Sequence, residues 1–178
     1  MPQHYGPLNT YISKLDYKHE SNLSSFNCTN SDQNDFLSSD ALEYARLSLG
    51  VTYLLFDGAS EKLLAFITLG TGAIKLPDKK EEWVLRGKKL KEYPKEFPRQ
   101  FPALRIGQLA TDCNEENKGA GTYLIHFAIR IGINLQANAG CAYLVANPYP
   151  ERVPWYEKRG FKILQEGKNT TQMYFELP

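Results

Sequence analysis

The stretch at residues 105–137 constrains the fold more than any other part of the chain, because it predicts a strand, a polar loop and a helix in direct succession. The apolar and β-branched residues within 106–111 predict a buried strand. The polar run at 112–118 then ends that strand. After it, apolar side chains recur at spacings of three and four, which predicts an amphipathic helix; they are Tyr123, Leu124, Phe127, Ala128, Ile131 and Leu135.

Two glycines, Gly119 and Gly121, stand where this loop passes into the helix. Glycine lets the backbone approach a ligand without a Cβ atom in the way. The first turn of a helix also presents free N–H groups and the positive end of the helix dipole, which together can hold a phosphate or a diphosphate. Such a glycine pair is equally typical of a tight strand-to-helix connection. Leu124 also stands where a third glycine would complete a dinucleotide fingerprint, so the pair alone does not identify a ligand.

The rest of the chain predicts a mixed α/β (α+β) fold with a mostly antiparallel sheet, because helix and strand patterns alternate along it without a repeat. Gly70 and Gly72 are expected to end or bulge a strand, and Gly140 to cap the long helix. The expected elements are a strand at 11–17, a helix between Asn30 and Gly50, a hairpin of strands at 51–56 and 63–69, a loose helix at 79–91, the strand and long helix described above, a strand at 141–146, a short helix at 151–159, and closing strands at 161–164 and 170–177.

The length and composition are typical of one globular domain. With 178 residues, 42% hydrophobic and 23% charged, residues 1–178 are expected to form a single domain. No apolar run has the length of a membrane span and no secretion signal is present, which favours a cytoplasmic location without a membrane partner. Cys28, Cys113 and Cys141 show no CxxC spacing, so neither a disulfide framework nor a metal site is expected. The oligomeric state stays open, and a homodimer is one alternative.

Charge is nearly balanced over the whole chain but not in one segment. The net charge of +1 gives no general attraction to nucleic acid. Between residues 75 and 100, nine Lys or Arg stand against five acidic residues, an excess of +4. A solvated surface with interleaved charges is the simpler interpretation. The alternative is that this Lys-rich insertion contacts the phosphates of a nucleic acid.

Two segments resemble conserved motifs of the GCN5-related N-acetyltransferases, the GNAT family. The segment QLATDCNEENKGAGTYLI, at 108–125, is similar to motif A, which runs Arg or Gln, two residues, Gly, one residue, then Gly or Ala. Gly119 and Gly121 match the motif, whereas Glu116 stands at the Arg or Gln position. The segment VPWYEKRGFKIL, at 153–164, resembles the FYEKxGF segment that closes the same fold. Two motifs in the expected order are more specific than either alone.

A third segment, LSSFNCTNSDQNDFL at 23–37, resembles the FxCG and LNxFL pattern of one GNAT branch, which includes toxins of toxin–antitoxin pairs. In that branch the segment is largely structural, so Cys28 is expected to be a buried small side chain rather than a nucleophile. The matching residues are Phe26, Cys28, Asn34, Phe36 and Leu37.

The resemblance implies an acetyl-CoA-dependent N-acetyltransferase, in which a primary amine attacks the thioester directly in a ternary complex. It places acetyl-CoA where the strand at 105–111 splays from the strand at 141–146. Tyr156 matches the family tyrosine that approaches the sulfur. The acceptor implied by the toxin-like branch is an aminoacyl-tRNA, with a small-molecule or protein amine as the alternatives. The implied acetyl-CoA-binding residues are Leu109, Ala110, Thr111, Asn117, Lys118, Gly119, Ala120, Gly121, Thr122 and Asn147.

Two features leave a different function open. No general base stands out, since Asp112 and Glu115 flank the loop and His126 lies on the amphipathic helix. Glu116 and the altered region at 147–154 depart from the family pattern. The second hypothesis is therefore a non-catalytic binding or regulatory module that keeps the GNAT fold.

Overall fold

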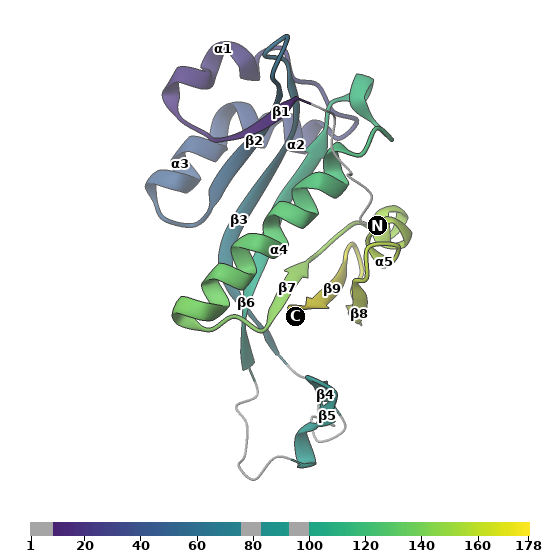
Figure 1. Cartoon of the computed structure of the whole chain (residues 1–178). Coiled ribbons are helices and arrows are strands. Elements are labelled where there is room, and N and C mark those ends of the chain that lie inside the picture. Colours follow the sequence, from purple (N-terminus) through teal and green to yellow (C-terminus); the bar gives the residue numbers. More distant parts are fainter. Residues whose placement is uncertain (1–8, 76–82, 93–99) are drawn as a thin grey trace.

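A computed structural model describes residues 9–75, 83–92 and 100–178 of the chain. A seven-stranded sheet with the order β1-β2-β3-β6-β7-β9-β8 forms its centre (Figure 1). The strands are β1 (Thr10–Lys14), β2 (Val51–Asp57), β3 (Leu63–Lys75), β6 (Gln100–Thr111), β7 (Tyr143–Ala146), β8 (Lys162–Glu166) and β9 (Thr171–Glu176), with β4 (Val84–Leu85) and β5 (Lys88–Lys89) in a separate hairpin. The α-helices are α1 (Glu20–Leu23), α2 (Ser31–Asp35), α3 (Ala41–Arg46), α4 (Ala120–Ala139) and α5 (Val153–Glu157).

The expected mixed fold with a mostly antiparallel sheet is confirmed. Every neighbouring pair in the large sheet is antiparallel except β6 and β7, which run parallel. A parallel pair needs a crossover connection. The long helix α4 provides it, because it lies between β6 and β7 in the chain and packs over the sheet (Figure 1).

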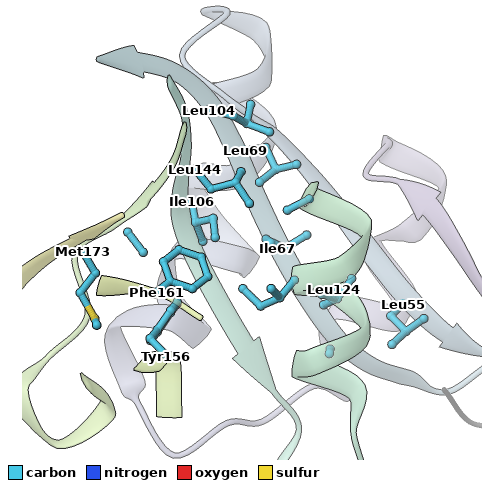
Figure 2. Close-up of a cluster of buried hydrophobic side chains, with 14 of the residues drawn as sticks. Leu55, Ile67, Leu69, Leu104, Ile106, Leu124, Leu144, Tyr156, Phe161 and Met173 are labelled. Atoms are coloured by element: carbon cyan, nitrogen blue, oxygen red, sulfur yellow. The ribbon is translucent and has the colours of Figure 1, made fainter. Parts of the chain in front are cut away.

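The sheet is covered on both faces, which the alternation of side chains along its central strands explains. On β3, Ile67 belongs to the apolar cluster that includes Leu124 and Ala128 of α4, whereas its neighbour Phe66 packs with Phe36 and the N-terminal helices. Figure 2 shows the α4 side of this core. The central strands are therefore buried on both sides.

The expected helix between Asn30 and Gly50 is present but not uniform. Asn30 caps α2 as predicted, because its side chain accepts a hydrogen bond of 2.9 Å from the backbone N–H of Asp32. Between α2 and α3, the segment Phe36–Asp40 forms a π-helix. Phe36 and Leu37 within it are buried, so the apolar face still packs on the sheet.

The prediction that Gly70 and Gly72 interrupt a strand is wrong. Strand β3 continues through both glycines to Lys75, paired with β6 as far back as Gln100. The irregularity lies just before them, between Thr68 and Leu69. Gly70 is needed for close approach rather than for a turn, because a Cβ atom there would lie 2.8 Å from the carbonyl oxygen of Leu49.

The helix predicted at 79–91 is also wrong where the structure describes this segment. Residues 83–92 instead hold the β4–β5 hairpin and a short 3₁₀ turn. The two residues between the strands, Arg86 and Gly87, have φ values of 48° and 76°. Positive φ at both positions is what a two-residue hairpin turn of type I′ requires. Most of the charged residues of the Lys-rich insertion lie at 76–82 and 93–99, outside the described residues.

Candidate functional site

The strands β6 and β7 part in the middle of the sheet, as the resemblance implied. They pair at four positions, from Ala103 with Tyr143 to Ile106 with Ala146. Beyond Ile106, β6 continues to Thr111 paired with β3 alone, while β7 ends at Ala146. One backbone edge of residues 107–111 therefore has no strand of the described residues beside it. Leu109, Ala110 and Thr111, three of the predicted acetyl-CoA-binding residues, lie on this stretch.

The carbonyl oxygen of Leu109 already has a hydrogen-bond donor. The side-chain nitrogen of Gln33, on α2, donates to this carbonyl at 3.1 Å and to the side-chain oxygen of Gln108 at 3.3 Å. A carbonyl oxygen has two lone pairs and can accept a second hydrogen bond. Gln33 thus holds α2 close to the part of β6 where the strands separate.

The polar loop leads directly from the end of β6 to the start of α4. Gly119 precedes the first residue of the helix with a φ of 96°, a conformation that suits glycine and disfavours other residues. A Cβ atom on Gly119 would meet no atom within 4 Å, so there is open space on that side of the backbone. On Gly121, a Cβ atom would lie 3.1 Å from the Trp155 ring and 3.5 Å from the Thr111 hydroxyl oxygen. The two motif glycines therefore serve different purposes, because Gly119 allows a positive φ and Gly121 allows close packing.

The acidic residues of the loop are structural. Asp112 is 1% exposed and accepts hydrogen bonds from the backbone amides of Asn27 (3.2 Å) and Asn114 (3.0 Å). Lys62 lies 3.3 Å from Asp112 and 3.1 Å from Glu115, and Lys118 lies 3.2 Å from Glu115. Burial acts to raise the pKa of Asp112 and of Glu115, but these hydrogen bonds and charges outweigh it and lower both pKa values.

These contacts also show which charged side chains of the loop are already paired with another residue. Two residues considered as bases, Asp112 and Glu115, are held by lysines, and the third, His126, is exposed on α4. The ammonium group of Lys118 is paired with Glu115. Glu116 accepts a hydrogen bond of 2.9 Å from the hydroxyl of Thr29, which ties it to the N-terminal segment.

Arg159 is the residue at this end of α4 that sequence reasoning missed. Its guanidinium donates to the Thr122 hydroxyl and, at 2.6 Å, to the carbonyl oxygen of Trp155. It also stacks over the Trp155 ring, 3.5 Å from the ring centre. Among the described residues no carboxylate pairs with it. The only sequence signal was an arginine at the unrestricted position of the FYEKxGF pattern.

Tyr156 is buried beside the apolar cluster under α4. Its ring packs edge-on against Phe161, with centroids 5.2 Å apart, and against Trp155 at 5.0 Å. Figure 2 shows Tyr156 and Phe161 close to Ile106, where β6 and β7 are still paired. Burial raises the pKa of the Tyr156 phenol above its ordinary value, although Arg159 and Arg152 oppose the rise. Within the described part of the chain, no hydrogen bond occupies its hydroxyl.

The structure brings most of the predicted site residues to one place. The end of β6, the start of α4 and helix α5 meet where Thr111, Gly121 and Trp155 approach one another. Asn117 and Thr122 lie in the loop and the first turn of α4 beside them, with Asn117 at a φ of 62°. Asn147 is exposed directly after β7, on the other parting strand. No helix of the described residues has the length and apolarity needed to cross a membrane.

Comparison with known proteins identifies the fold. No family model and no curated protein matches the sequence. Solved structures do match: AtaT complexed with acetyl-methionyl-tRNAfMet (TM-score 0.77, 21% identity, covering 94% of this chain and 95% of that chain), a mutant of KacT (0.78, 19%, 96% and 96%) and AtaTR bound with AcCoA (0.75, 21%, 95% and 94%). The chain therefore has the GNAT fold.

Proposed function

We propose that this protein is an acetyl-CoA-dependent N-acetyltransferase that transfers an acetyl group to a primary amine by direct attack in a ternary complex. One observation carries the proposal. The unpaired edge of β6 at 107–111 leads through the polar loop to the first turn of α4, where Gly119 leaves open space at its Cβ position. An extended amide-bearing ligand and a diphosphate are the two chemical groups that these features bind best.

The residues fit the groups of acetyl-CoA. The diphosphate would accept hydrogen bonds from backbone amides between Asn117 and Thr122, at the positive end of the α4 dipole. The amide-rich pantetheine arm would add to the edge of β6 beside Leu109 and Thr111, and Ala110 between them packs inward. Asn147 would contact the arm from the other side. The φ of 96° at position 119 is the structural reason for glycine there.

Acetyl-CoA supplies an acetyl group activated as a thioester. The acceptor amine, in its neutral form, forms the new C–N bond as the C–S bond breaks. Backbone N–H groups of β6 at its unpaired edge would stabilise the oxygen charge that develops. Tyr156 would donate a proton to the departing sulfur, whose thiol has a reference pKa of about 8.5 by analogy with cysteine. The proton that the amine nitrogen loses as the amide forms would return to the Tyr156 phenolate through water, which restores the phenol. Because burial raises the pKa of Tyr156, its phenol stays protonated at neutral pH.

The acceptor within this proposal is the α-amine of an aminoacyl-tRNA. The support is that a solved structure of the same fold, AtaT, is complexed with acetyl-methionyl-tRNAfMet. The excess of positive charge at 75–100 would add affinity for phosphates. A small-molecule or protein amine is the alternative acceptor, and acetyl transfer that does not depend on salt would favour it.

The decisive experiment is titration with acetyl-CoA, followed by differential scanning fluorimetry and calorimetry. A ligand that binds the native state raises the melting temperature, and the rise grows with the logarithm of the ligand concentration relative to its Kd. Release of the CoA thiol, measured with an amine and with methionyl-tRNA, then reports turnover. Failure of acetyl-CoA to bind at millimolar concentration would overturn the proposal. Binding of acetyl-CoA without any thiol release would instead support the non-catalytic module. The observation that favours this module is Glu116, which replaces the Arg or Gln of the motif and accepts a hydrogen bond from Thr29.

A further inference from the structure

A hollow lies on the other face of β6, against the N-terminal helices. Its volume is about 120 Å³, and its wall includes the aromatic rings of Phe36 and Tyr44 and the β-strand residues Thr68, Arg105 and Gln108. Gly107 completes the wall on β6. The hollow is therefore partly aromatic and partly polar, and none of the described residues that line it carries a carboxylate.

The hollow reaches the point where the two strands part. Gly107 is the first residue of β6 beyond the last pair with β7, Ile106 with Ala146. It is also the extra residue at the irregularity between β3 and β6, because Gln108 pairs with Thr68 and Ile106 with Leu69. The same backbone thus borders both the hollow and the unpaired edge of β6. A group bound in the hollow lies next to a group bound at the start of that edge.

Arg105 is the charged group of this hollow, and the neighbouring strand makes room for it. Arg105 pairs with Gly70 on β3, and a Cβ atom on Gly70 would lie 3.6 Å from the arginine's terminal nitrogen. A Cβ atom on Gly72 would lie 3.4 Å from the Arg105 Cβ. The two glycines that do not break β3 therefore leave space beside this side chain.

The charge of Arg105 is not neutralised by the parts of the chain that the structure describes. No described carboxylate forms an ion pair with it. On the helices that face the hollow, Glu43 of α3 is bound by Arg46 at 2.5 Å instead. An exposed cation next to two aromatic rings repels a second cation and attracts an anion.

We propose that this hollow receives the amine-bearing end of the acetyl acceptor, and that Arg105 selects acceptors that carry an anionic group, a phosphate ester or a carboxylate, close to the amine. The inference rests on the proposed acetyltransferase function and adds the class of acceptor to it. Along a strand, the Cα atoms of Arg105 and Gly107 are ~7 Å apart, so one small molecule could reach both positions. Polyamines and other acceptors with a second positive charge are disfavoured.

The test uses three amines that differ only at one end: 3-aminopropyl phosphate, 3-aminopropanol and 1,3-diaminopropane. Thiol release is measured at fixed ionic strength with wild type, Arg105→Gln and Arg105→Lys. With wild type, kcat/KM for the phosphate should exceed that for the alcohol by about tenfold, the effect of one charge-assisted hydrogen bond. Arg105→Gln should remove this preference, because kcat/KM for the phosphate falls toward that for the alcohol, and Arg105→Lys should keep part of it. Arg130→Gln, an exposed arginine on α4, is the matched control.

Methionyl-tRNA distinguishes the source of the anion. If a nucleic-acid phosphate is the natural anion, Arg105→Gln should raise the KM for methionyl-tRNA and make the salt dependence less steep. If a small molecule is the natural acceptor, methionyl-tRNA should be a poor substrate of wild type and 3-aminopropyl phosphate the better one. Either result supports the inference.

Two further readouts separate the failure of this inference from the failure of the proposed function. Acetyl-CoA affinity is measured for wild type and Arg105→Gln and should be equal. If wild type does not bind acetyl-CoA, the proposed function is wrong and this inference falls with it. If acetyl-CoA binds but the three amines show no preference that depends on Arg105, only the inference is overturned. Where turnover is too slow, saturation-transfer NMR measures the binding of 3-aminopropyl phosphate in the presence of CoA. Equal binding to wild type and Arg105→Gln would refute the inference.

Discussion

The guanidinium of Arg159 donates two hydrogen bonds, of 2.9 Å and 2.6 Å, to the hydroxyl of Thr122 in the first turn of α4. This contact joins the turn after α5 to the start of α4, although 37 residues separate them in sequence. It also places a positive charge near the loop whose motif position is occupied by Glu116 rather than Arg or Gln. Positive charge at this end of the proposed diphosphate site therefore comes from a different element.

Replacing Arg159 with Ala should raise the Kd for acetyl-CoA by about tenfold, because one charge-assisted interaction with phosphate is lost and Thr122 is no longer oriented. Arg159→Lys should recover only part of the lost affinity for acetyl-CoA, since an ammonium group cannot make the forked contact with Thr122 and the Trp155 carbonyl. Isothermal titration calorimetry measures the change. Lys158→Ala, at the exposed neighbouring position, is the control and should bind as wild type does. An unchanged Kd in both variants would show that Arg159 has only a structural role.

Gly121→Ala should destabilise the junction of α4 and α5. The added Cβ atom would lie 3.1 Å from Cζ2 of Trp155, so the ring must shift, and overpacking of this kind costs about 1–3 kcal/mol in the free energy of unfolding. Urea denaturation measures the loss. In a double-mutant cycle, Trp155→Phe removes the ring atoms that clash, so Gly121→Ala should cost less in that background. Equal costs in the two backgrounds would mean that Trp155 is not the obstacle.

Asp112 should make stability depend on pH. Its folded-state pKa is lowered, so its contribution is fully present above the unfolded pKa of about 3.9 and is lost as the pH falls through the folded value. Asp112→Asn should therefore lower the free energy of unfolding at pH 7 by about 1–3 kcal/mol, by removing a buried charge partner of Lys62. At pH 3 the difference from wild type should be smaller.

Urea unfolding at the two pH values, with exposed Asp35→Asn as the control, gives the comparison. A difference between wild type and Asp112→Asn that is as large at pH 3 as at pH 7 would show that the carboxylate charge is not what stabilises the loop.

The centre of the fold could be predicted from sequence because its signals are local. The periodicity of α4 lies within one helix, and its two ends carry glycines whose φ values of 96° and 81° only glycine adopts readily. The parting of β6 and β7 was available only through the family resemblance, since no residue of either strand signals where pairing stops. The Asn30 cap was likewise local and correct.

The incorrect predictions concern residues whose conformation is determined by contacts with residues far away in the sequence. Gly70 was read as a strand breaker, yet its backbone is held by β6 on one side and faces the Leu49 carbonyl. Instead of the helix expected at 79–91, Arg86 and Gly87 form a hairpin turn with positive φ at both residues. Trp83, just before this hairpin, donates a hydrogen bond of 2.9 Å to the Tyr143 hydroxyl. Arg159 was missed for the same reason, because its partner Thr122 lies 37 residues away in the first turn of α4. Long-range contacts of this kind leave no pattern in the sequence.

Tyr156→Phe tests whether the buried phenol acts in the reaction. Phenylalanine fills the same space against Phe161 and Trp155, so the fold and the Kd for acetyl-CoA should not change. If the hydroxyl donates the proton that the departing sulfur needs, kcat should fall about 10²-fold or more. Because burial raises the pKa of this phenol, wild type should lose no activity through its ionisation between pH 7 and pH 9. Steady-state thiol release across that range, with exposed Tyr149→Phe as the control, measures both effects. A Tyr156→Phe enzyme with the wild-type kcat would leave the side chain a purely packing role, and the proton would have to come from water instead.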